Sequence, residues 1–255
     1  MSDTSLHRRL RVLGLQGVAG ELDDLVALAT KKRWGPTQML EHVADIEERE
    51  RSRRGLERRL SRSHLGPFKT IADYDWNWPT KIDRPLVEAA VGLHFLGAAR
   101  NVVLVAPQGL GKTMIAQNIA HQAIVQGHSV LFTTAAQMLL DLGGQESSRA
   151  LESRLKHYAK QSLLVVDEVG YLAFDNRNAD LLFQVVSRRY ERKSLVLTTN
   201  LAFKDWPTVF PNATCATALI DRVIHHADVI GIEGKSYRLR EAEDAAKKES
   251  PKPKK

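Results

Sequence analysis

The sequence predicts an α/β fold in which a parallel β-sheet is flanked by helices, preceded by a small all-helical N-terminal domain. After residue 100, helical patterns alternate with short apolar segments: NVVLVA (101–106), SVLFTT (129–134), SLLVVD (162–167), SLVLTT (194–199) and ADVIGI (227–232). Segments that are almost entirely apolar are typical of strands buried on both faces, as in parallel sheets covered by helices. Residues 1 to 65, in contrast, contain only helical patterns.

Glycine and proline divide the N-terminal part. Breaks are expected at Gly14, Gly17 and the corner Trp34-Gly35-Pro36, and a helix is expected to start near Thr37, whose hydroxyl is suited to capping it. The predicted organisation is a helical domain (1–65), a linker with a leading helix (66–99), an α/β domain (100–241) and a charged tail expected to be disordered (242–255). The aromatic residues of the linker are expected to pack against the core as a clasp, in preference to stacking on bases: Tyr74, Trp76 and Trp78.

Composition narrows the class of protein. A chain of 255 residues with 43% hydrophobic residues can bury a sizeable core. The 37 Lys and Arg outnumber the 30 Asp and Glu, which is compatible with an anionic partner such as nucleic acid but is also common in other proteins. Cys215 has no partner for an internal disulfide, and the sequence contains neither a signal peptide nor a run of roughly 18 apolar residues. We therefore expect a cytoplasmic protein that does not enter a membrane.

The stretch APQGLGKT (106–113) lies between an apolar strand and a helical pattern, which is the setting of a phosphate-binding loop. Gly109 and Gly111 would supply the tight backbone, Lys112 would reach the β and γ phosphates, and Thr113 would bind Mg²⁺. Ala106 stands where glycine is usual, although a small residue should suffice at a strand end. A plain glycine turn is the alternative. The expected nucleotide-binding residues are Ala106, Pro107, Gln108, Gly109, Leu110, Gly111, Lys112, Thr113 and Met114.

Polar residues end two later strands. In LLVVDEVGYL (163–172), Asp167 is expected near the magnesium ion, which such a carboxylate usually contacts through water. Glu168 is expected near the attacking water, which it would polarise. Paired acids at this place favour hydrolysis over transfer to a small hydroxyl compound, although a pair that only caps the strand end is the alternative. Asn200 follows SLVLTT and is expected to help position the water, unless it merely begins a turn.

Phosphoryl transfer also benefits from an arginine, often supplied by a neighbouring subunit. Arg222 in ATALIDRVIHH is the best candidate, and a plain surface or DNA-facing role is its alternative. His225 and His226 are expected to pack or to face solvent, because two adjacent histidines do not make a metal site. Competing arginines lie at one basic helix end, where a solvated face is the simpler interpretation: Arg188, Arg189 and Arg192.

Arginine is concentrated before the linker, where the only acids between residues 49 and 62 are Glu50 and Glu57. The expected DNA-binding residues are Arg49, Arg51, Arg53, Arg54, Arg58, Arg59 and Arg62. In a helix, the residues at 51, 54, 58 and 62 fall on one stripe. Guanidinium groups suit bidentate contacts with phosphates, so we expect binding to the backbone of duplex DNA without a sequence code. A solvated helix face and an acidic protein partner are the alternatives.

The order of these motifs closely resembles the IstB-like ATP-binding proteins, AAA+ ATPase helpers of bacterial insertion-sequence transposition that are related to DnaC-type helicase loaders. The resemblance runs from LRVLGLQGVAGELDDL to SYRLRE near residue 241 and includes DEVGYL, LLFQVVSRRYE, TTN and ALIDRVIHHADVIGIEGKSYRLRE. The phosphate loop and the acidic pair occur in very many ATPases, whereas GYL, FQVVSRRYER and DRVIHHADVI are far more specific.

The resemblance implies a P-loop NTPase of the AAA+ type with ATP and Mg²⁺ as cofactors. It assigns Walker A to Lys112 and Thr113, Walker B to Asp167 and Glu168, sensor 1 to Asn200, and a trans-acting finger to Arg222. Ala106 departs from the family pattern, as does Met114, which replaces a histidine common after the threonine; neither change removes a group that hydrolysis needs. The chain stops soon after Arg240, too early for the helical lid of larger AAA+ proteins, and this leaves Arg238 as only a guess for sensor 2.

The function that this resemblance implies is an ATP-dependent DNA-binding helper. It would oligomerise on target DNA, assist the transposase of the same element, and hydrolyse ATP to regulate its assembly. A replicative helicase loader is the nearest alternative. A small-molecule kinase without affinity for DNA and a nucleotide-gated scaffold without turnover are the others.

Overall fold

The computed structural model describes residues 5–171 and 173–241; the tail predicted to be disordered, 242–255, lies outside the described residues. The chain forms two compact units, Met1–Arg59 and Leu60–Lys255. No helix in the described part of the chain is long and apolar enough to cross a membrane.

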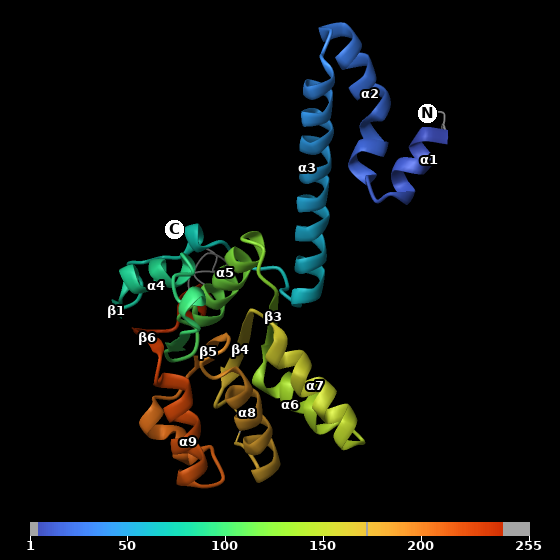
Figure 1. Cartoon of the computed structure of the whole chain (residues 1–255). Coiled ribbons are helices and arrows are strands. Elements are labelled where there is room, and N and C mark those ends of the chain that lie inside the picture. Colours follow the sequence, from blue (N-terminus) through green and yellow to red (C-terminus); the bar gives the residue numbers. More distant parts are fainter. Residues whose placement is uncertain (1–4, 172, 242–255) are drawn as a thin grey trace, which may run out of the picture. The chain divides into compact units, whose positions relative to one another are not determined.

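The first unit is all-helical, as predicted, and contains α1 (Ser5–Val12), α2 (Gln16–Lys32) and most of α3 (Pro36–Ser63) (Figure 1). Its core consists of Val18, Leu25 and Ile46, with partly buried apolar side chains packed around them. At Gly17 the two longer helices lie so close that a Cβ atom would come within 2.7 Å of Cβ of Glu50, which requires glycine there.

The prediction that Thr37 caps α3 is wrong, although the helix begins close to that residue. The helix begins at Pro36, so Thr37 lies inside its first turn. Proline is favoured at the first helical position because its missing N–H group would have no partner there. The N–H of Gly35 instead donates to Oε1 of Gln38 at 3.0 Å, and this closes the helix start.

The second unit is built on one sheet, whose described strands have the order β1-β6-β2-β5-β4-β3. The strands are β1 (Lys81–Ile82), β2 (Asn101–Val105), β3 (Val130–Thr134), β4 (Leu163–Val169), β5 (Ser194–Thr199) and β6 (Ala227–Glu233). β1 pairs antiparallel with β6, and the other neighbouring strands pair in parallel. The five predicted strands are confirmed, and β1 adds a short antiparallel edge.

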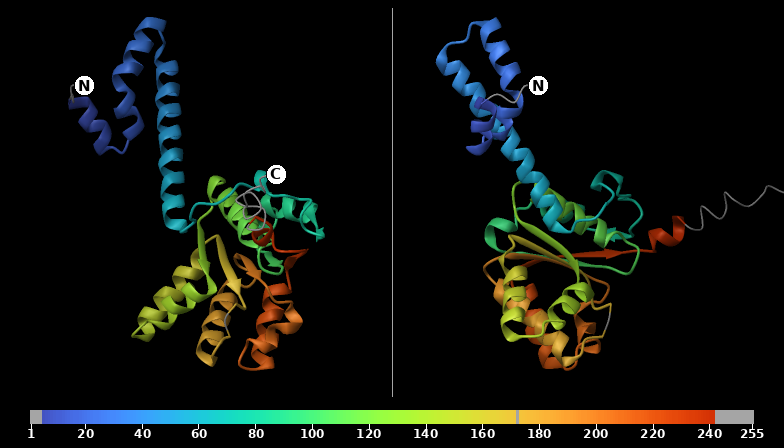
Figure 2. Two further views of the ribbon diagram at one scale, coloured as in Figure 1. Left: turned by 180° about the vertical axis from the view of Figure 1, so that it is seen from behind. Right: turned by 90° about the vertical axis from the view of Figure 1, so that its right-hand side faces the viewer.

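Helices cover both faces of this sheet, which makes three layers (Figure 1). One face carries α4 (Arg84–Val91) and α5 (Lys112–Val125), and the other carries α6 (Ala135–Gly143), α7 (Ser148–Lys160), α8 (Asn176–Arg189) and α9 (Ala213–Ile224); Figure 2 gives two further views of these layers. Short 3-10 turns complete the chain: η1 (Ile71–Asp73), η2 (Leu96–Ala98) and η3 (Phe203–Thr208). The α/β prediction is therefore confirmed.

Side-chain caps fix where several helices begin. An oxygen of the capping residue accepts a hydrogen bond from a main-chain N–H in the first turn, which satisfies a donor that the helix cannot. The capping residues are Asp83, Thr134, Ser147, Asp175 and Asn212. Because β2, β5 and β4 are neighbours and parallel, the loops after them meet at one edge of the sheet, where ligands of α/β proteins commonly bind.

Candidate nucleotide-binding site

The loop between β2 and α5 has the backbone of a phosphate-binding loop. Gly109 and Gly111 have φ angles of +79° and +84°, a region that only glycine enters readily. A Cβ at Gly109 would overlap the hydroxyl of Ser236, and one at Gly111 would lie 2.6 Å from a ring carbon of Tyr74. Both glycines are therefore required by conformation and by space, and the loop delivers the chain to the N-terminus of α5 at Lys112.

Lys112 points back across its own loop. Its Nζ donates to the carbonyl oxygens of Ala106, at 2.7 Å, and Pro107, at 2.8 Å. Burial lowers the pKa of Lys112, and the nearby carboxylate of Asp167 offsets part of this shift. The ammonium group is thus held at the N-terminal end of α5, where helix and side chain both favour an anion.

The two acids lie within a break in the regular pairing of β4. The register of β4 with β5 shifts between Val166 and Val169, and Glu168 has a φ angle of +62°. Such bulges re-aim side chains beside functional sites. Here the irregularity lies at Asp167, which is 4% exposed, and at the exposed Glu168, and both side chains line the same cavity.

Thr198 on β5 anchors both acids, a role that the sequence did not reveal. Its fully buried hydroxyl donates to Oδ1 of Asp167 and accepts from the main-chain N–H of Glu168 at 3.0 Å. The other carboxylate oxygen of Asp167 accepts from Oγ1 of Thr113 at 2.9 Å. One buried hydroxyl therefore ties the acidic pair to the neighbouring strand, and Thr113 ties it to the phosphate loop.

The pair Thr113 and Asp167 fits a magnesium ion. Mg²⁺ takes oxygen ligands in octahedral geometry at about 2.1 Å, which places adjacent ligand oxygens about 3 Å apart. The two oxygens of this pair lie 2.9 Å apart and belong to a hydroxyl and a carboxylate, which are hard ligands of the kind that Mg²⁺ prefers.

These groups surround a cavity of about 760 Å³. The predicted residues that line it are Gln108, Gly109, Leu110, Gly111, Lys112, Thr113, Met114, Asp167, Glu168 and Asn200. Ala106 directly follows β2, and its N–H donates to the carbonyl oxygen of Thr199 at 3.1 Å. Arg238, the candidate for sensor 2, also lines the cavity.

The linker closes one side of the cavity, and its aromatic residues pack on the core as predicted. The hydroxyl of Tyr74 donates to the carbonyl oxygen of Leu110 at 3.0 Å, and Nε1 of Trp78 donates to that of Lys235 at 2.7 Å. Trp76 packs edge-on against Tyr74, with ring centres 4.8 Å apart. The clasp thus joins the linker to the phosphate loop and to the segment after β6.

Arg222 does not line the cavity of its own chain. Its guanidinium lies 4.3 Å from the ring centre of Phe183 and hydrogen-bonds the hydroxyl of Ser187, so it stands partly exposed on α9 beside α8. Of its competitors, Arg188 forms an ion pair with Glu152 at 2.7 Å.

Arg189 is not part of a solvated face, and that interpretation was wrong. Its side chain is 1% exposed, and burial lowers its pKa to about 9. The guanidinium donates to main-chain carbonyl oxygens of α7, the turn after it and the start of β5: Tyr158, Ala159, Gln161, Ser162 and Ser194. A side chain enclosed in this way is a structural clamp and cannot reach a nucleotide.

The arginine-rich segment is helical, as expected, and forms the C-terminal half of α3. Several of its arginines are paired with carboxylates of the first unit. Glu47 accepts from Arg51 at 3.0 Å and from Arg54 at 3.3 Å, and Arg53 bridges two further glutamates. Arg49 lies 3.5 Å from Glu21. Of the remaining residues of the set, Arg58 and Arg62 are exposed and Arg59 is half-buried.

Comparisons with known proteins agree with this geometry. The family profile described as IstB-like ATP binding protein matches residues 8–245. The chain is 34% identical to the ATP-binding protein of insertion sequence IS21 from Pseudomonas aeruginosa, over 91% of this chain and 88% of that protein. It is also 34% identical to that of IS232 from Bacillus thuringiensis subsp. berliner, over 92% and 94%.

Solved structures share the fold at lower identity. The replication initiator DnaA bound to AMPPCP and single-stranded DNA superimposes with a TM-score of 0.56 at 16% identity, over 75% of this chain and 58% of that one. DnaI superimposes with a TM-score of 0.53 at 18% identity, over 64% and 90%. These likenesses establish the AAA+ type of P-loop fold, and the match over nearly the whole sequence establishes more: the chain belongs to the family of IstB-like ATP-binding proteins.

Proposed function

We propose that this protein is a Mg²⁺-dependent ATPase that oligomerises on duplex DNA and assists the transposase of its own insertion sequence. The observation that carries the proposal is the joint anchoring of Asp167 and Glu168 by Thr198, in one cavity with Lys112. A binding site alone would need the lysine and the loop. A second, exposed acid held at a fixed place is what the activation of water requires.

The polar residues that the motifs contribute to the cavity have distinct tasks in this proposal. Lys112 and the N–H groups at the start of α5 bind phosphate oxygens. Thr113 and Asp167 hold Mg²⁺, which when bound neutralises charge on the phosphates. Glu168 polarises the attacking water and Asn200 orients it, both from the ends of neighbouring parallel strands.

Arg222 is proposed to act on a neighbouring subunit. It lies outside the cavity of its own chain and is partly exposed, which suits a group that completes the site of another copy. Assembly and hydrolysis are then linked, because each site lacks its arginine until a second chain binds beside it. An arginine finger contributes about 10³- to 10⁵-fold to turnover in related chemistry.

A mixing experiment tests this division of labour. Glu168→Gln keeps the nucleotide site and the arginine but lacks the base, whereas Arg222→Ala keeps the base but lacks the arginine. Each variant alone should bind ATP and release almost no phosphate. Mixing them should restore turnover at interfaces that join an intact Glu168 to an intact Arg222. Failure of the mixture to gain activity, with both variants folded and binding ATP, contradicts an action in trans.

DNA binding is proposed to use the exposed arginines of α3. Arg58 and Arg62 are expected to contribute most, because Arg51, Arg53 and Arg54 already share carboxylates. Phosphate contacts release counterions, so binding should weaken steeply with salt. The measurement is phosphate release with and without duplex DNA at two salt concentrations. DNA-stimulated turnover that falls with salt, and falls further in Arg58→Gln/Arg62→Gln, is expected.

Two outcomes would contradict the proposal at different points. Turnover that ignores DNA, with no binding at low salt, would remove DNA from the mechanism while leaving the ATPase. ATP binding without phosphate release in the presence of DNA would indicate a nucleotide-gated scaffold. Lys112→Ala should abolish nucleotide binding and serves as the control for both measurements.

A further inference from the structure

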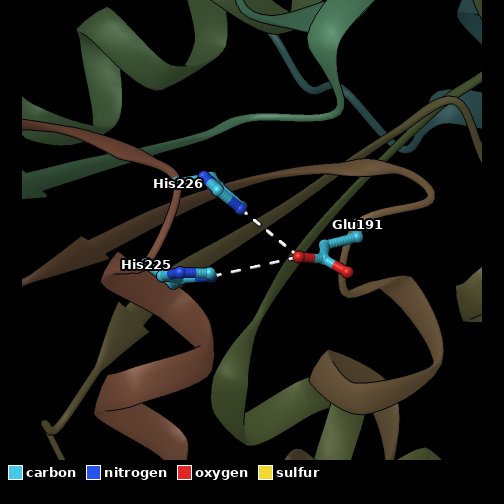
Figure 3. A group of neighbouring side chains, drawn as sticks. All are labelled: Glu191, His225 and His226. Atoms are coloured by element: carbon cyan, nitrogen blue, oxygen red, sulfur yellow. Dashed lines mark hydrogen bonds and ion pairs between the residues drawn. The ribbon is translucent and has the colours of Figure 1, made fainter.

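Three ligand-bearing side chains meet at the edge of the sheet opposite the nucleotide cavity: Glu191, His225 and His226 (Figure 3). Glu191 belongs to the turn between α8 and β5, and the two histidines lie between α9 and β6. Both strands run parallel to β2, whose carboxyl end leads into the phosphate loop. Because the cluster precedes β5 and β6, it lies at their amino ends, away from the nucleotide.

The spacing of the ligand atoms is close to that of a tetrahedral metal site. Oε1 of Glu191 lies 3.3 Å from Nε2 of His226 and 4.0 Å from Nδ1 of His225, and the ligand atoms of all three residues lie within 4.8 Å of one another. Zn²⁺ binds nitrogen and carboxylate oxygen at about 2.0–2.2 Å, which places tetrahedral ligand atoms about 3.3–3.6 Å apart. The pair Glu191 and His226 already has this spacing, and binding requires the exposed side chain of His225 to move closer to Glu191.

The main chain at these residues is fixed by the fold. Glu191 has a φ angle of +56°, and the N–H groups of Arg192 and Lys193 both donate to the carbonyl oxygen of Arg189 at 2.9 Å. On the other side, the carbonyl oxygen of His226 accepts from Asn101 N–H at 2.8 Å. These hydrogen bonds fix the main chain on both sides of the cluster, so binding an ion has to order only the side chains.

We propose that Glu191, His225 and His226 form a binding site for a transition-metal dication, with Zn²⁺ as the ion that fits the ligand set. Imidazole nitrogens suit zinc, whereas Mg²⁺ prefers oxygen ligands, so the site is chemically distinct from the Thr113 and Asp167 pair. Side chains that are 47% to 54% exposed leave room for water as the fourth ligand.

Two details of the surroundings affect the ion. The hydroxyl of Tyr190 lies 2.6 Å from Nδ1 of His225, so ligation through Nε2 keeps this hydrogen bond and ligation through Nδ1 replaces it. Arg222 lies one helical turn before His225 on α9. The ion therefore joins the turn after α8 to the end of the helix that carries Arg222.

The test uses the full chain without an affinity tag, after removal of metals by chelation and in excess Mg²⁺. Zn²⁺ is titrated against a chromophoric zinc chelator. One equivalent is expected to bind, and Glu191→Gln and His226→Ala should each weaken binding by about tenfold or more, since loss of even an outer partner has that effect. His94→Ala, which removes an exposed histidine elsewhere, should leave it unchanged.

Co²⁺ gives an independent readout of the same site. Its visible absorption should report a nitrogen- and oxygen-ligated ion of low coordination number in the wild type and should lose intensity in Glu191→Gln and His226→Ala. Circular dichroism shows whether each variant is folded. Absence of Zn²⁺ binding by the wild type, or equal affinity in the wild type and in both folded variants, overturns the proposal.

Discussion

Replacing Thr198 by valine removes one hydroxyl group and keeps the shape of a fully buried side chain. In the wild type this hydroxyl donates to Oδ1 of Asp167 and accepts from the N–H of Glu168. The variant leaves the carboxylate with its bond from Thr113 and leaves the N–H of Glu168 without this acceptor. Both acids then lose the anchor that fixes them to β5, while Thr113 still ties Asp167 to the phosphate loop.

The size of the effect follows from the hydrogen bonds that are lost. A hydrogen bond to a charged group contributes about 1.5–3 kcal/mol, which corresponds to about 10- to 150-fold in rate if the transition state needs that arrangement. The loss of these two hydrogen bonds also lowers the free energy of unfolding, by about 1–3 kcal/mol. Affinity for ATP should stay close to that of the wild type, because Lys112 and the loop glycines are unchanged.

Thr199→Val is the matched control. Thr199 is the next residue of β5 and is equally buried. Its hydroxyl accepts from the N–H of Leu201 at 3.1 Å, whereas the hydroxyl of Thr198 bonds Asp167 and Glu168. Steady-state phosphate release, ATP binding and urea unfolding are measured for both variants. Thr198→Val should lose turnover and Thr199→Val should lose only stability. Equal turnover in the two valine variants would refute the anchoring role of Thr198.

Three further predictions concern stability. Gly17→Ala should destabilise the helical unit by about 1–3 kcal/mol, because the new Cβ would lie 2.7 Å from that of Glu50; calorimetry should show this with ATP binding unchanged, and an unaltered melting temperature would contradict it. Burial works against ionisation of Glu47, but hydrogen bonds from Arg51 and from main-chain N–H groups of α2 hold the pKa of Glu47 below its ordinary value of 4.5. The stability that ionised Glu47 provides is present above pH 4.5 and is lost as the pH falls through the lowered pKa. The melting temperature of the wild type should therefore decline as the pH falls below 4.5, and that of Glu47→Gln should decline less. Arg189→Met should lower the free energy of unfolding by about 3 kcal/mol or more, since several buried carbonyl oxygens lose their donor; a loss below about 1 kcal/mol in urea titrations would show that water replaces the clamp.

Most of the sheet could be predicted because the pattern of apolar residues in its strands is typical of one environment. Runs such as VVLV (102–105) and LLVV (163–166) are apolar at every position, which is typical of strands buried between two helical layers. The observed strands end within two residues of the expected ones. β1 escaped prediction because Lys81–Ile82 is short and half exposed, and it becomes a strand only by pairing with β6.

The residues of the site, likewise, could be predicted where they belong to a contiguous motif and could not where only the fold brings them together. The phosphate loop and the acidic pair are contiguous motifs, so their residues could be named from sequence. Thr198 could not, because a threonine in a strand is unremarkable until its hydroxyl is seen beside Asp167. Glu191 and His226 come from separate segments, and no local pattern connects them. Arg189 looked solvated because its helix end is basic, although the helix turns that one side chain inward.

The walls of the nucleotide cavity are joined by hydrogen bonds between residues that lie far apart in the sequence of the second unit. Nε1 of Trp78 donates to the carbonyl oxygen of Lys235, and the guanidinium of Arg240 donates to the carboxylate of Asp75, across separations of 157 and 165 residues. Loops of that length close at an entropic cost that is recovered only after the sheet between their ends has formed. The sheet bears a comparable cost, because β6 pairs with β1 across a similar length of chain. We therefore expect the cavity to close only after β6 has joined the sheet, so that a chain emerging from the ribosome can hold ATP only after residue 240 has emerged.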